Sequence, residues 1–192
     1  MKKINYLLTL LLLLTSAGCS ASDDNNEPPA IKGKILVAYF SYSGNTRQVA
    51  EDIKNLTEAD IFEIIPVEPY PEDYDEVVAQ ARRERESGYK PPLKAKVANL
   101  VEYDVVFVGF PIWGTTIPNT ILTFLTENNM AGKTVIPFCT HAGYGKGRSF
   151  TAVQELCPGA TFAEGFDMEG DDVKDAEPQL RKWLEEIKVI NP

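Results

Sequence analysis

The feature that most constrains the fold is a continuous apolar run, Val105 to Phe110, near the middle of the chain. Runs of this kind are typical of strands that are buried on both faces, as in a parallel sheet covered by helices. Ile35 to Phe40 and Lys133 to Cys139 are expected to form further strands of this sheet. Between these runs, apolar residues recur three or four positions apart, a spacing that predicts helices. The alternation favours a parallel sheet with helices on both faces.

The expected elements alternate along one α/β domain. Strands are predicted at residues 35–40, 59–65, 105–110, 133–139 and 161–166, and helices at 45–55, 71–87, 118–128, 149–156 and 173–189. Right-handed crossovers then give a three-layer, doubly wound, five-stranded parallel sheet with the strand order 2-1-3-4-5. The segment from Tyr89 to Glu102 lacks periodicity and is either a lid or a long link.

The second predicted helix carries many charges. Its buried face is predicted from helical spacing to consist of Tyr74, Val77, Val78 and Ala81. Its acids lie near the start and its arginines near the end, where both suit the helix dipole. The charges are therefore interpreted as a solvated surface in preference to a binding patch.

The loop Ser41-Tyr42-Ser43-Gly44-Asn45-Thr46 joins the first predicted strand to the first predicted helix. It offers hydroxyl groups, an amide and the unpaired backbone N–H groups of a helix start, which together favour an anion such as a phosphate. Gly44 allows the backbone to turn closely around that anion. Ser, Thr and Asn are also preferred at helix N-termini, so an ordinary capping loop is the alternative.

Two further loops leave the carboxyl ends of neighbouring strands. They are Pro111-Ile112-Trp113-Gly114 after the third strand and Thr140 to Gly147 after the fourth. In the order 2-1-3-4-5, ligands bind at the switch point between strands one and three. The three loops are therefore expected to converge on one crevice.

These loops together resemble those of the flavodoxin-like family. The phosphate loop of that family has the form Thr/Ser-x-Thr/Ser-Gly-x-Thr, and residues 41–46 satisfy this form at every place. The resemblance covers essentially the whole chain after the first 31 residues and implies FMN as the cofactor. The cofactor-binding residues that it implies are Ser41, Tyr42, Ser43, Gly44, Asn45, Thr46, Pro111, Ile112, Trp113, Gly114, Thr140, His141, Ala142, Gly143 and Tyr144.

Three of these positions have open alternatives. Trp113 could stack on the flavin ring or hold its loop against the core. Tyr144 could supply a second aromatic wall or be simply exposed, and backbone N–H groups from Ala142 onward could bind the carbonyl oxygens of the ring. His141 could place a cation beside the ring or form a hydrogen bond within its own loop.

Charged residues near the loops lead to two further expectations. The loop after the fourth predicted strand carries Lys146 and Arg148 and no acidic residue. A bound flavin should therefore have a less negative reduction potential than in family members with acidic rims. Arg47, just inside the first helix, is a weaker candidate for a phosphate contact. No residue near the loops is predicted to act as a catalytic acid, base or nucleophile.

The first residues are expected to direct export. Lys2 and Lys3 precede an apolar run that ends at small residues before Cys19, so residues 1–18 are predicted to be a signal peptide. The segment resembles bacterial lipoprotein signals, and this resemblance implies lipidation of Cys19, although Ser16 stands where the usual Leu would be. An uncleaved anchor is the alternative.

The rest of the chain divides into a tether and a domain. Residues 19–31 are predicted to be an acidic, disordered tether, because they contain too few apolar residues to bury a core. Residues 32–192 are predicted to be the flavodoxin-like domain. The implied location is the bacterial cell envelope, on its periplasmic or surface side, with the lipid anchor as the only link to the membrane.

Composition limits the partners and the chemistry. The formal net charge of −9 argues against nucleic acid, and a single His without clustered Cys argues against a metal site. A phosphatase of similar fold would need a Cys nucleophile in the phosphate loop, which residues 41–46 lack. The predicted function is FMN-dependent electron transfer with a membrane redox protein or a quinone as partner. The alternatives are an NAD(P)H-dependent quinone or flavin reductase and a flavin-free binding lipoprotein.

Overall fold

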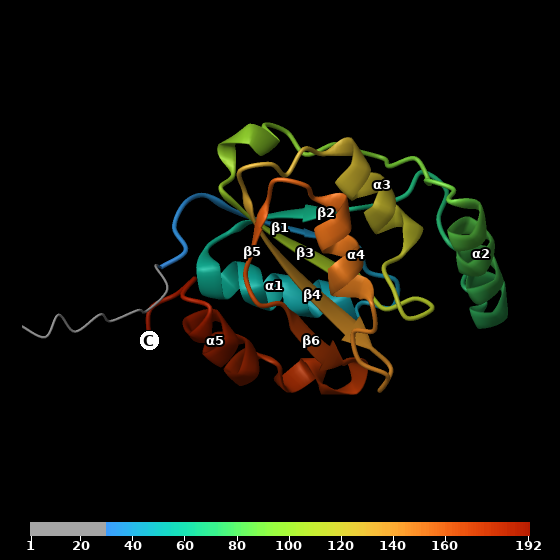
Figure 1. Cartoon of the computed structure of the whole chain (residues 1–192). Coiled ribbons are helices and arrows are strands. Elements are labelled where there is room, and N and C mark those ends of the chain that lie inside the picture. Colours follow the sequence, from blue (N-terminus) through green and yellow to red (C-terminus); the bar gives the residue numbers. More distant parts are fainter. Residues whose placement is uncertain (1–29) are drawn as a thin grey trace, which may run out of the picture.

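The computed structural model describes residues 30–192, which form one α/β domain (Figure 1). The predicted signal peptide, Cys19 and most of the predicted tether lie outside the described residues. Ile31, at the end of that tether, donates its backbone N–H to the carbonyl of Lys188 at 3.0 Å and packs against the core. Within residues 30–192, no helix is both long and apolar enough to cross a membrane.

Six strands form one parallel sheet at the centre of the domain. They are β1 (Ile35–Tyr39), β2 (Asp60–Glu63), β3 (Val105–Pro111), β4 (Thr134–His141), β5 (Thr161–Phe162) and β6 (Phe166–Glu169). The order β2-β1-β3-β4-β5 confirms the predicted fold, and β6 also pairs with β4. Because every pairing is parallel, the carboxyl ends of β1, β3 and β4 meet at one edge of the sheet.

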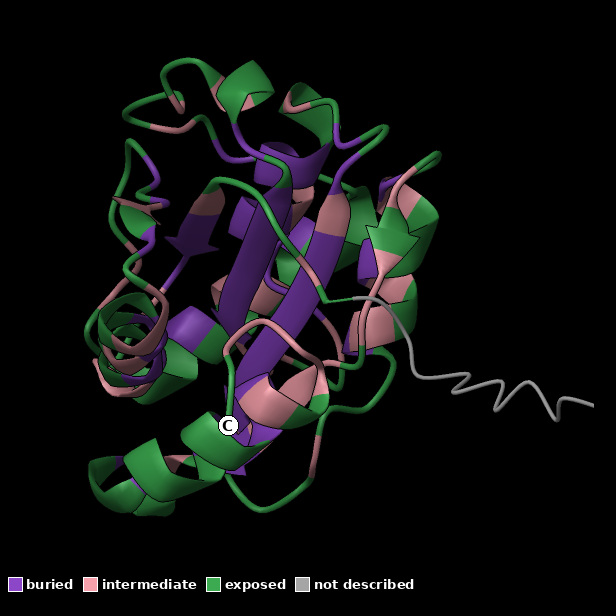
Figure 2. Ribbon diagram, turned by 90° about the vertical axis from the view of Figure 1, so that its left-hand side faces the viewer, coloured by how far each residue is buried: buried purple, intermediate pink, exposed green. Residues whose placement is uncertain are grey.

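Helices cover both faces of this sheet. They are α1 (Asn45–Thr57), α3 (Asn119–Glu127), α4 (Ser149–Leu156) and α5 (Glu177–Glu186). The other helical elements are α2 (Tyr74–Ser87) and the short 3-10 turns η1 (Leu100–Glu102) and η2 (Gly170–Asp175). One core cluster joins α1 and α5 to one face, and a second cluster joins α3 and α4 to the opposite face. Figure 2 shows the central strands buried between these layers.

Strand β3 is buried on both faces, as its apolar run predicts. Val105 and Phe107 pack in the cluster with α1 and α5, whereas Val106, Val108 and Phe110 pack in the cluster with α3 and α4. Phe107 and Phe110 are both fully buried. Burial of one such side chain contributes about 1.5–3 kcal/mol. This strand therefore anchors both layers.

The last predicted strand is broken into β5 and β6. Strand β5 pairs with the start of β4 and β6 pairs with its end. Between them lies Pro137 of β4, which has no backbone N–H to offer a neighbouring strand. A Cβ atom at Gly165 would lie 2.5 Å from the carbonyl oxygen of Pro137, so the chain passes close to β4 without pairing. The prediction of one strand at 161–166 is therefore wrong in two ways. The pairing is interrupted between residues 162 and 166, and it continues beyond the predicted end to Glu169.

The C-terminal helix is shorter than its predicted range of 173–189. Residues 170–175 form η2, and α5 begins at Glu177 with Pro178 in its first turn. Proline is tolerated there, but in a helix interior it removes a hydrogen bond and clashes with the preceding turn. A helix that began at Val173 would have placed Pro178 in its interior, so the predicted start is wrong.

Helix α2 does not bury the face that its sequence predicts. Val77 is buried, but Tyr74 is 75% exposed and Val78 is 40% exposed. The helix stands away from the sheet, beyond the carboxyl ends of the strands, and packs beside α3 (Figure 1). Its buried charged residue is Glu84. The helical spacing identified an apolar face but not what that face contacts.

The segment 89–102 is a link and not a lid. The backbone N–H of Val67 donates to the carbonyl of Pro92 at 2.7 Å, and the N–H of Lys94 donates to the carbonyl of Ile65 at 2.8 Å. Within the segment, Leu93 and Val97 pack against the core. The segment therefore runs beside the chain that leaves β2.

Candidate functional site

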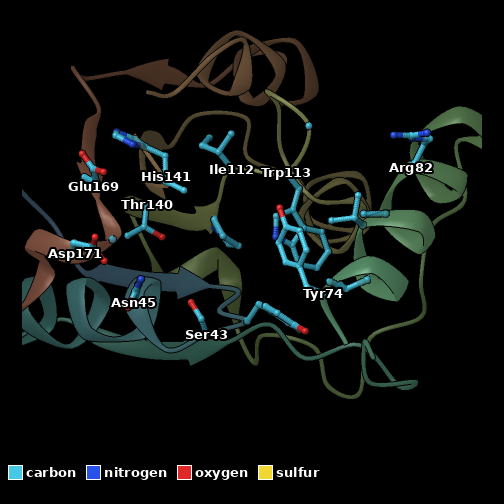
Figure 3. A pocket seen from close by; sticks show the side chains of 18 of the residues that line it. Ser43, Asn45, Tyr74, Arg82, Ile112, Trp113, Thr140, His141, Glu169 and Asp171 are labelled. Carbon is cyan, nitrogen blue, oxygen red and sulfur yellow. The ribbon is translucent and has the colours of Figure 1, made fainter. Parts of the chain in front are cut away.

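One cavity of about 680 Å³ opens at the carboxyl ends of β1, β3 and β4 (Figure 3). Its volume lies within the range of small-molecule sites, ~300–1,000 Å³. The residues of the three predicted loops that line it are Tyr42, Ser43, Asn45, Pro111, Ile112, Trp113, Gly114, Thr140, His141 and Ala142. The structure thus brings the three loops to one place.

The loop between β1 and α1 is shaped from within. The Ser41 hydroxyl accepts hydrogen bonds from the backbone N–H groups of Gly44 and Arg47, both at 3.2 Å. Gly44 has a φ of 97°, a left-handed conformation that glycine adopts readily. These residues set the path of the loop without lining the cavity themselves.

The same loop presents free donors at the start of α1. Within residues 30–192, no acceptor is found for the backbone N–H groups of Ser43, Asn45 and Thr46. The side chains of Ser43 and Asn45 likewise form no hydrogen bond with the described part of the chain. Unpaired N–H groups at the positive end of a helix dipole are suited to bind an anion.

Two buried hydroxyl groups join this loop to β4. The Oγ1 atoms of Thr46 and Thr140 lie 2.8 Å apart, and both side chains are buried. Thr140 and His141 were predicted to lie in a loop, but both belong to the end of β4. Their positions are therefore fixed by the sheet.

Arg47 turns away from the cavity. Its guanidinium pairs with Glu63 of β2, and its Nε donates to the Tyr39 hydroxyl at 3.4 Å. The hydrogen bond to Glu63 raises the pKa of Arg47 above its ordinary value. This arrangement gives no support to the expected contact between Arg47 and a phosphate.

Trp113 lies where the cavity meets the core. Its ring makes edge contacts with the rings of Phe40, Tyr42 and Tyr70, with centroid separations of 5.5, 5.7 and 4.8 Å. Trp113 also lines the cavity, so its position is compatible with both roles that the sequence left open. The aromatic contacts fix the orientation of the ring, which a stacking wall requires.

The turn after Trp113 has an unusual backbone. Gly114 and Thr115 have φ values of 58° and 68°, and Trp113 and Thr116 exchange backbone hydrogen bonds across the turn. A β-branched residue such as Thr115 is strained in this conformation, and such strain is concentrated at functional sites. The Thr115 carbonyl accepts the backbone N–H of Arg148 at 2.9 Å, which joins the turn to the loop after β4.

His141 is hydrogen-bonded within its own loop, one of the two alternatives that its sequence left open. Its Nδ1 accepts the backbone N–H of Gly143 at 3.2 Å, and its Nε2 lies 3.4 Å from Oδ2 of Asp167 on β6. The other carboxylate oxygen of Asp167 lies 3.4 Å from Nζ of Lys146. The ring of His141 is fixed in this way at the wall of the cavity.

Acids reach the cavity from an element that the sequence did not indicate. Glu169 at the end of β6 and Asp171 in η2 line the wall, with Gly170 between them. Because the last strand is broken, β6 extends past the predicted end and carries these acids to the site. The expectation of a less negative reduction potential considered only the loop after β4, and Glu169 and Asp171 weaken its basis. The potential itself stays a prediction.

Helix α2 supplies a further wall. Its residues at the cavity are Tyr74, Val77, Val78, Ala81, Arg82 and Arg85. Their helical spacing was visible in the sequence, but it was interpreted as a face packed on the core. Figure 3 shows Arg82 across the cavity from Glu169 and Asp171. The charges of α2 therefore belong in part to the site.

The sequence profile of the flavodoxin family matches residues 34–187. The chain belongs to the flavodoxin family. Two solved Bacteroides proteins that are assigned as flavoproteins are similar to it. The protein from B. eggerthii is 34% identical with a TM-score of 0.72, over 81% of this chain and 98% of its own. The protein from B. uniformis is 31% identical with a TM-score of 0.72, over 80% of this chain and 98% of its own.

A more distant flavoprotein shares the flavodoxin fold. It comes from Lactobacillus acidophilus and was solved in complex with FMN. It is 21% identical with a TM-score of 0.63, over 79% of this chain and 99% of its own. No curated protein matches the sequence.

Five residues implied by the flavodoxin resemblance do not line the cavity, namely Ser41, Gly44, Thr46, Gly143 and Tyr144. Gly143 and Tyr144 follow the residues that line it, and Tyr144 is 90% exposed. The sequence left simple exposure of Tyr144 open as an alternative, and the Tyr144 side chain is exposed in the structure. A contact of Gly143 or Tyr144 with a ligand stays a prediction.

The two thiols in the described part of this flavodoxin-family chain are not reactive groups. Cys139 and Cys157 are free and buried. Burial raises the pKa of Cys139 to about 12 and that of Cys157 to about 11. A buried thiol with a raised pKa is a poor nucleophile at neutral pH. In the part of the chain that the structure describes, no cluster of His, Cys, Asp and Glu could hold a metal ion.

Proposed function

We propose that the protein binds FMN and transfers electrons through it. The proposal is carried by one cavity that has two chemically different parts. Unpaired N–H groups at Ser43, Asn45 and Thr46 suit a phosphate. Ile112 and Trp113 form an apolar wall that suits a flat ring. FMN has both of these parts, and a flavoprotein of the same fold has been solved with FMN.

The residues present fit this cofactor. The side chains of Ser43 and Asn45 line the cavity and are free to bind phosphate oxygens. Val77 and Val78 of α2 add apolar surface for a ring. FMN, when bound, supplies electron transfer in steps of one or two electrons. The protein's part is to hold the phosphate, to fix the ring and to limit its contact with water.

A fluorescence titration of the purified chain with FMN tests the proposal. FMN should bind, and riboflavin, which lacks the phosphate, should bind about tenfold more weakly or worse. Gly44→Val should weaken FMN binding and leave riboflavin binding little changed, because the variant distorts the phosphate loop. Arg47→Met, outside the cavity, is the matched control and should change neither. A chain that neither binds FMN nor is stabilised by it would support the flavin-free alternative.

We also propose that the protein acts in the bacterial cell envelope, anchored through a lipid on Cys19. The support is the sequence of residues 1–31 alone, which carries an export signal before Cys19 and an acidic tether after it. Nicotinamide cofactors are scarce outside the cytoplasm, so a membrane redox protein or a quinone is the proposed partner. Metabolic labelling with a fatty acid should mark the wild-type protein, and Cys19→Ala should remove the label.

A quinone or flavin reductase that uses NAD(P)H is the second candidate. It is favoured by α2, which forms a wall of the cavity and so encloses space for a small molecule beside Trp113. Consumption of NADH or NADPH by the FMN-loaded chain, with a quinone present, measures this activity. A rate no faster than that of free FMN would leave electron carriage as the function.

A further inference from the structure

Arginines gather around the turn after β3. Arg82 and Arg85 of α2 line the main cavity, and Arg85 and Arg148 line a neighbouring hollow of about 360 Å³. Arg85 and Gly114 line both. The cavity and the hollow are therefore neighbouring parts of one region, and the three arginines lie along it.

These arginines have no partner within residues 30–192. No carboxylate of the described chain lies within 4.0 Å of Arg82, Arg85 or Arg148, and none of their side chains donates a hydrogen bond to it. Glu155 lines the hollow without pairing with either arginine there. The chain as a whole carries a net charge of −9, so carboxylates for pairing are abundant. The three guanidinium groups are exposed and unpaired, and all of them lie at the cavity or at the neighbouring hollow.

The turn leaves space for the Arg85 side chain. A Cβ atom at Gly114 would lie 2.5 Å from Nη1 of Arg85. The next residue, Thr115, keeps a strained φ of 68°, and its carbonyl accepts the backbone N–H of Arg148. The turn thus places Arg85 against its backbone and ties Arg148 to the same point.

We propose that Arg82, Arg85 and Arg148 form a binding site for the anionic group of a small-molecule substrate, whose body enters the cavity beside Trp113. The proposal rests on the FMN site of the proposed function, because the body of the substrate would then lie against the flavin. A guanidinium group binds a carboxylate or a phosphate through two parallel hydrogen bonds. Either anion satisfies the chemistry of the site.

The charges on opposite walls of the cavity would orient a bound anionic substrate. Glu169 and Asp171 lie on the wall opposite Arg82 (Figure 3). An anionic group is repelled by those acids and attracted by the arginines. The net charge of the chain is −9, and basic groups at the margin of a cavity raise the rate at which an anion finds it.

Isothermal titration of the FMN-saturated full chain tests the site, with inorganic pyrophosphate and citrate as separate probes. Saturation with FMN keeps the loop at residues 41–46 occupied. At least one probe should bind with a Kd on the order of 1 mM or tighter, and more weakly at high salt. Tighter pyrophosphate binding indicates a phosphorylated substrate, and tighter citrate binding indicates a carboxylic acid.

Variants assign the binding to the arginines. Combining Arg85→Ala with Arg148→Ala should weaken the tighter probe about tenfold or more. Gly114→Ala retains all three charges but displaces the Arg85 guanidinium, so it should also weaken binding. Arg83→Ala is the matched control, because Arg83 lies on the same helix but lines neither hollow, and it should change nothing. Thermal denaturation confirms that each variant is folded.

Two results overturn the proposal: equal binding by the wild type and the double arginine variant, or no binding of either probe by folded wild-type protein. A failure of the FMN site is recognised separately, as a colourless chain that FMN does not stabilise. The same variants then test the arginines in the flavin-free protein. An anion held by the loop at residues 41–46 would not respond to them.

Discussion

The hydroxyl groups of Thr46 and Thr140 lie 2.8 Å apart in the buried interior of the site. Thr46 stands in the first turn of α1, and Thr140 stands near the end of β4. This contact links the helix that follows the loop at residues 41–46 directly to the strand that carries His141. Two of the three loops at the cavity are therefore held in register by one hydrogen bond.

We expect Thr46→Val and Thr140→Val each to lower the free energy of unfolding by about 1–3 kcal/mol, because the remaining hydroxyl loses its buried partner. The double variant should cost less than the sum of the two, since neither hydroxyl is then left unpaired. Urea denaturation measures the free energy of unfolding of the flavin-free wild type, the two single variants and the double variant. Strict additivity would mean that the two hydroxyls do not interact.

A second prediction concerns Tyr70, which ties α2 to the rest of the site. Its hydroxyl donates to Oε2 of the buried Glu84 at 2.7 Å, and its ring contacts Trp113. Tyr70→Phe keeps the ring and removes the donor, so it should cost about 1–3 kcal/mol and speed hydrogen exchange in α2. Tyr74→Phe, on an exposed side chain, is the control. Unchanged exchange in Tyr70→Phe would show that other contacts hold α2.

Alkaline pH should destabilise the protein through its buried thiols. Burial raises the pKa of Cys157 from 9.0 to about 11. The folded state therefore keeps the thiol protonated. The resulting stabilisation is complete below the pKa of Cys157 in the unfolded chain, and it is lost as the pH rises toward the pKa of Cys157 in the folded chain. Over that range, the melting temperature of Cys157→Ala should fall less than that of the wild type. Parallel curves would assign the loss to other groups.

Strain at Thr115 predicts a stabilising substitution. Asparagine tolerates a positive φ better than a β-branched residue does, so Thr115→Asn should raise the free energy of unfolding by about 1 kcal/mol. The neighbouring Thr116 does not have a positive φ, and Thr116→Asn should bring no gain. Denaturant titration of both variants gives the comparison. A loss of stability in Thr115→Asn would mean that the threonine side chain makes a contact worth more than the strain.

The sheet and its order could be predicted because strands buried on both faces leave a continuous apolar signal, as Val105 to Phe110 does. The loop at residues 41–46 could be placed for a related reason. Its glycine and hydroxyl residues stand at a junction of strand and helix, where a helix N-terminus can receive an anion. The order of strands then brought the loops after β1, β3 and β4 together without any knowledge of side-chain contacts.

The missed features depend on contacts between distant parts of the chain. The break between β5 and β6 is set by Pro137, which lies on the neighbouring strand. The apolar face of α2 was visible, but periodicity does not tell whether a face meets a core or a cavity. Glu169 and the arginines of α2 reach the site only through these two departures.

The sheet offers little open edge to a second chain. On one side, β5 has 2 residues and β6 has 4, and the gap at Gly165 interrupts the row of backbone donors and acceptors. On the other side, β2 has 4 residues and is followed by a bridge between Pro66 and Leu93. Short, interrupted edges resist strand-to-strand pairing between molecules. For a chain that is proposed to act in the cell envelope, the break that carries Glu169 to the site would also guard against aggregation.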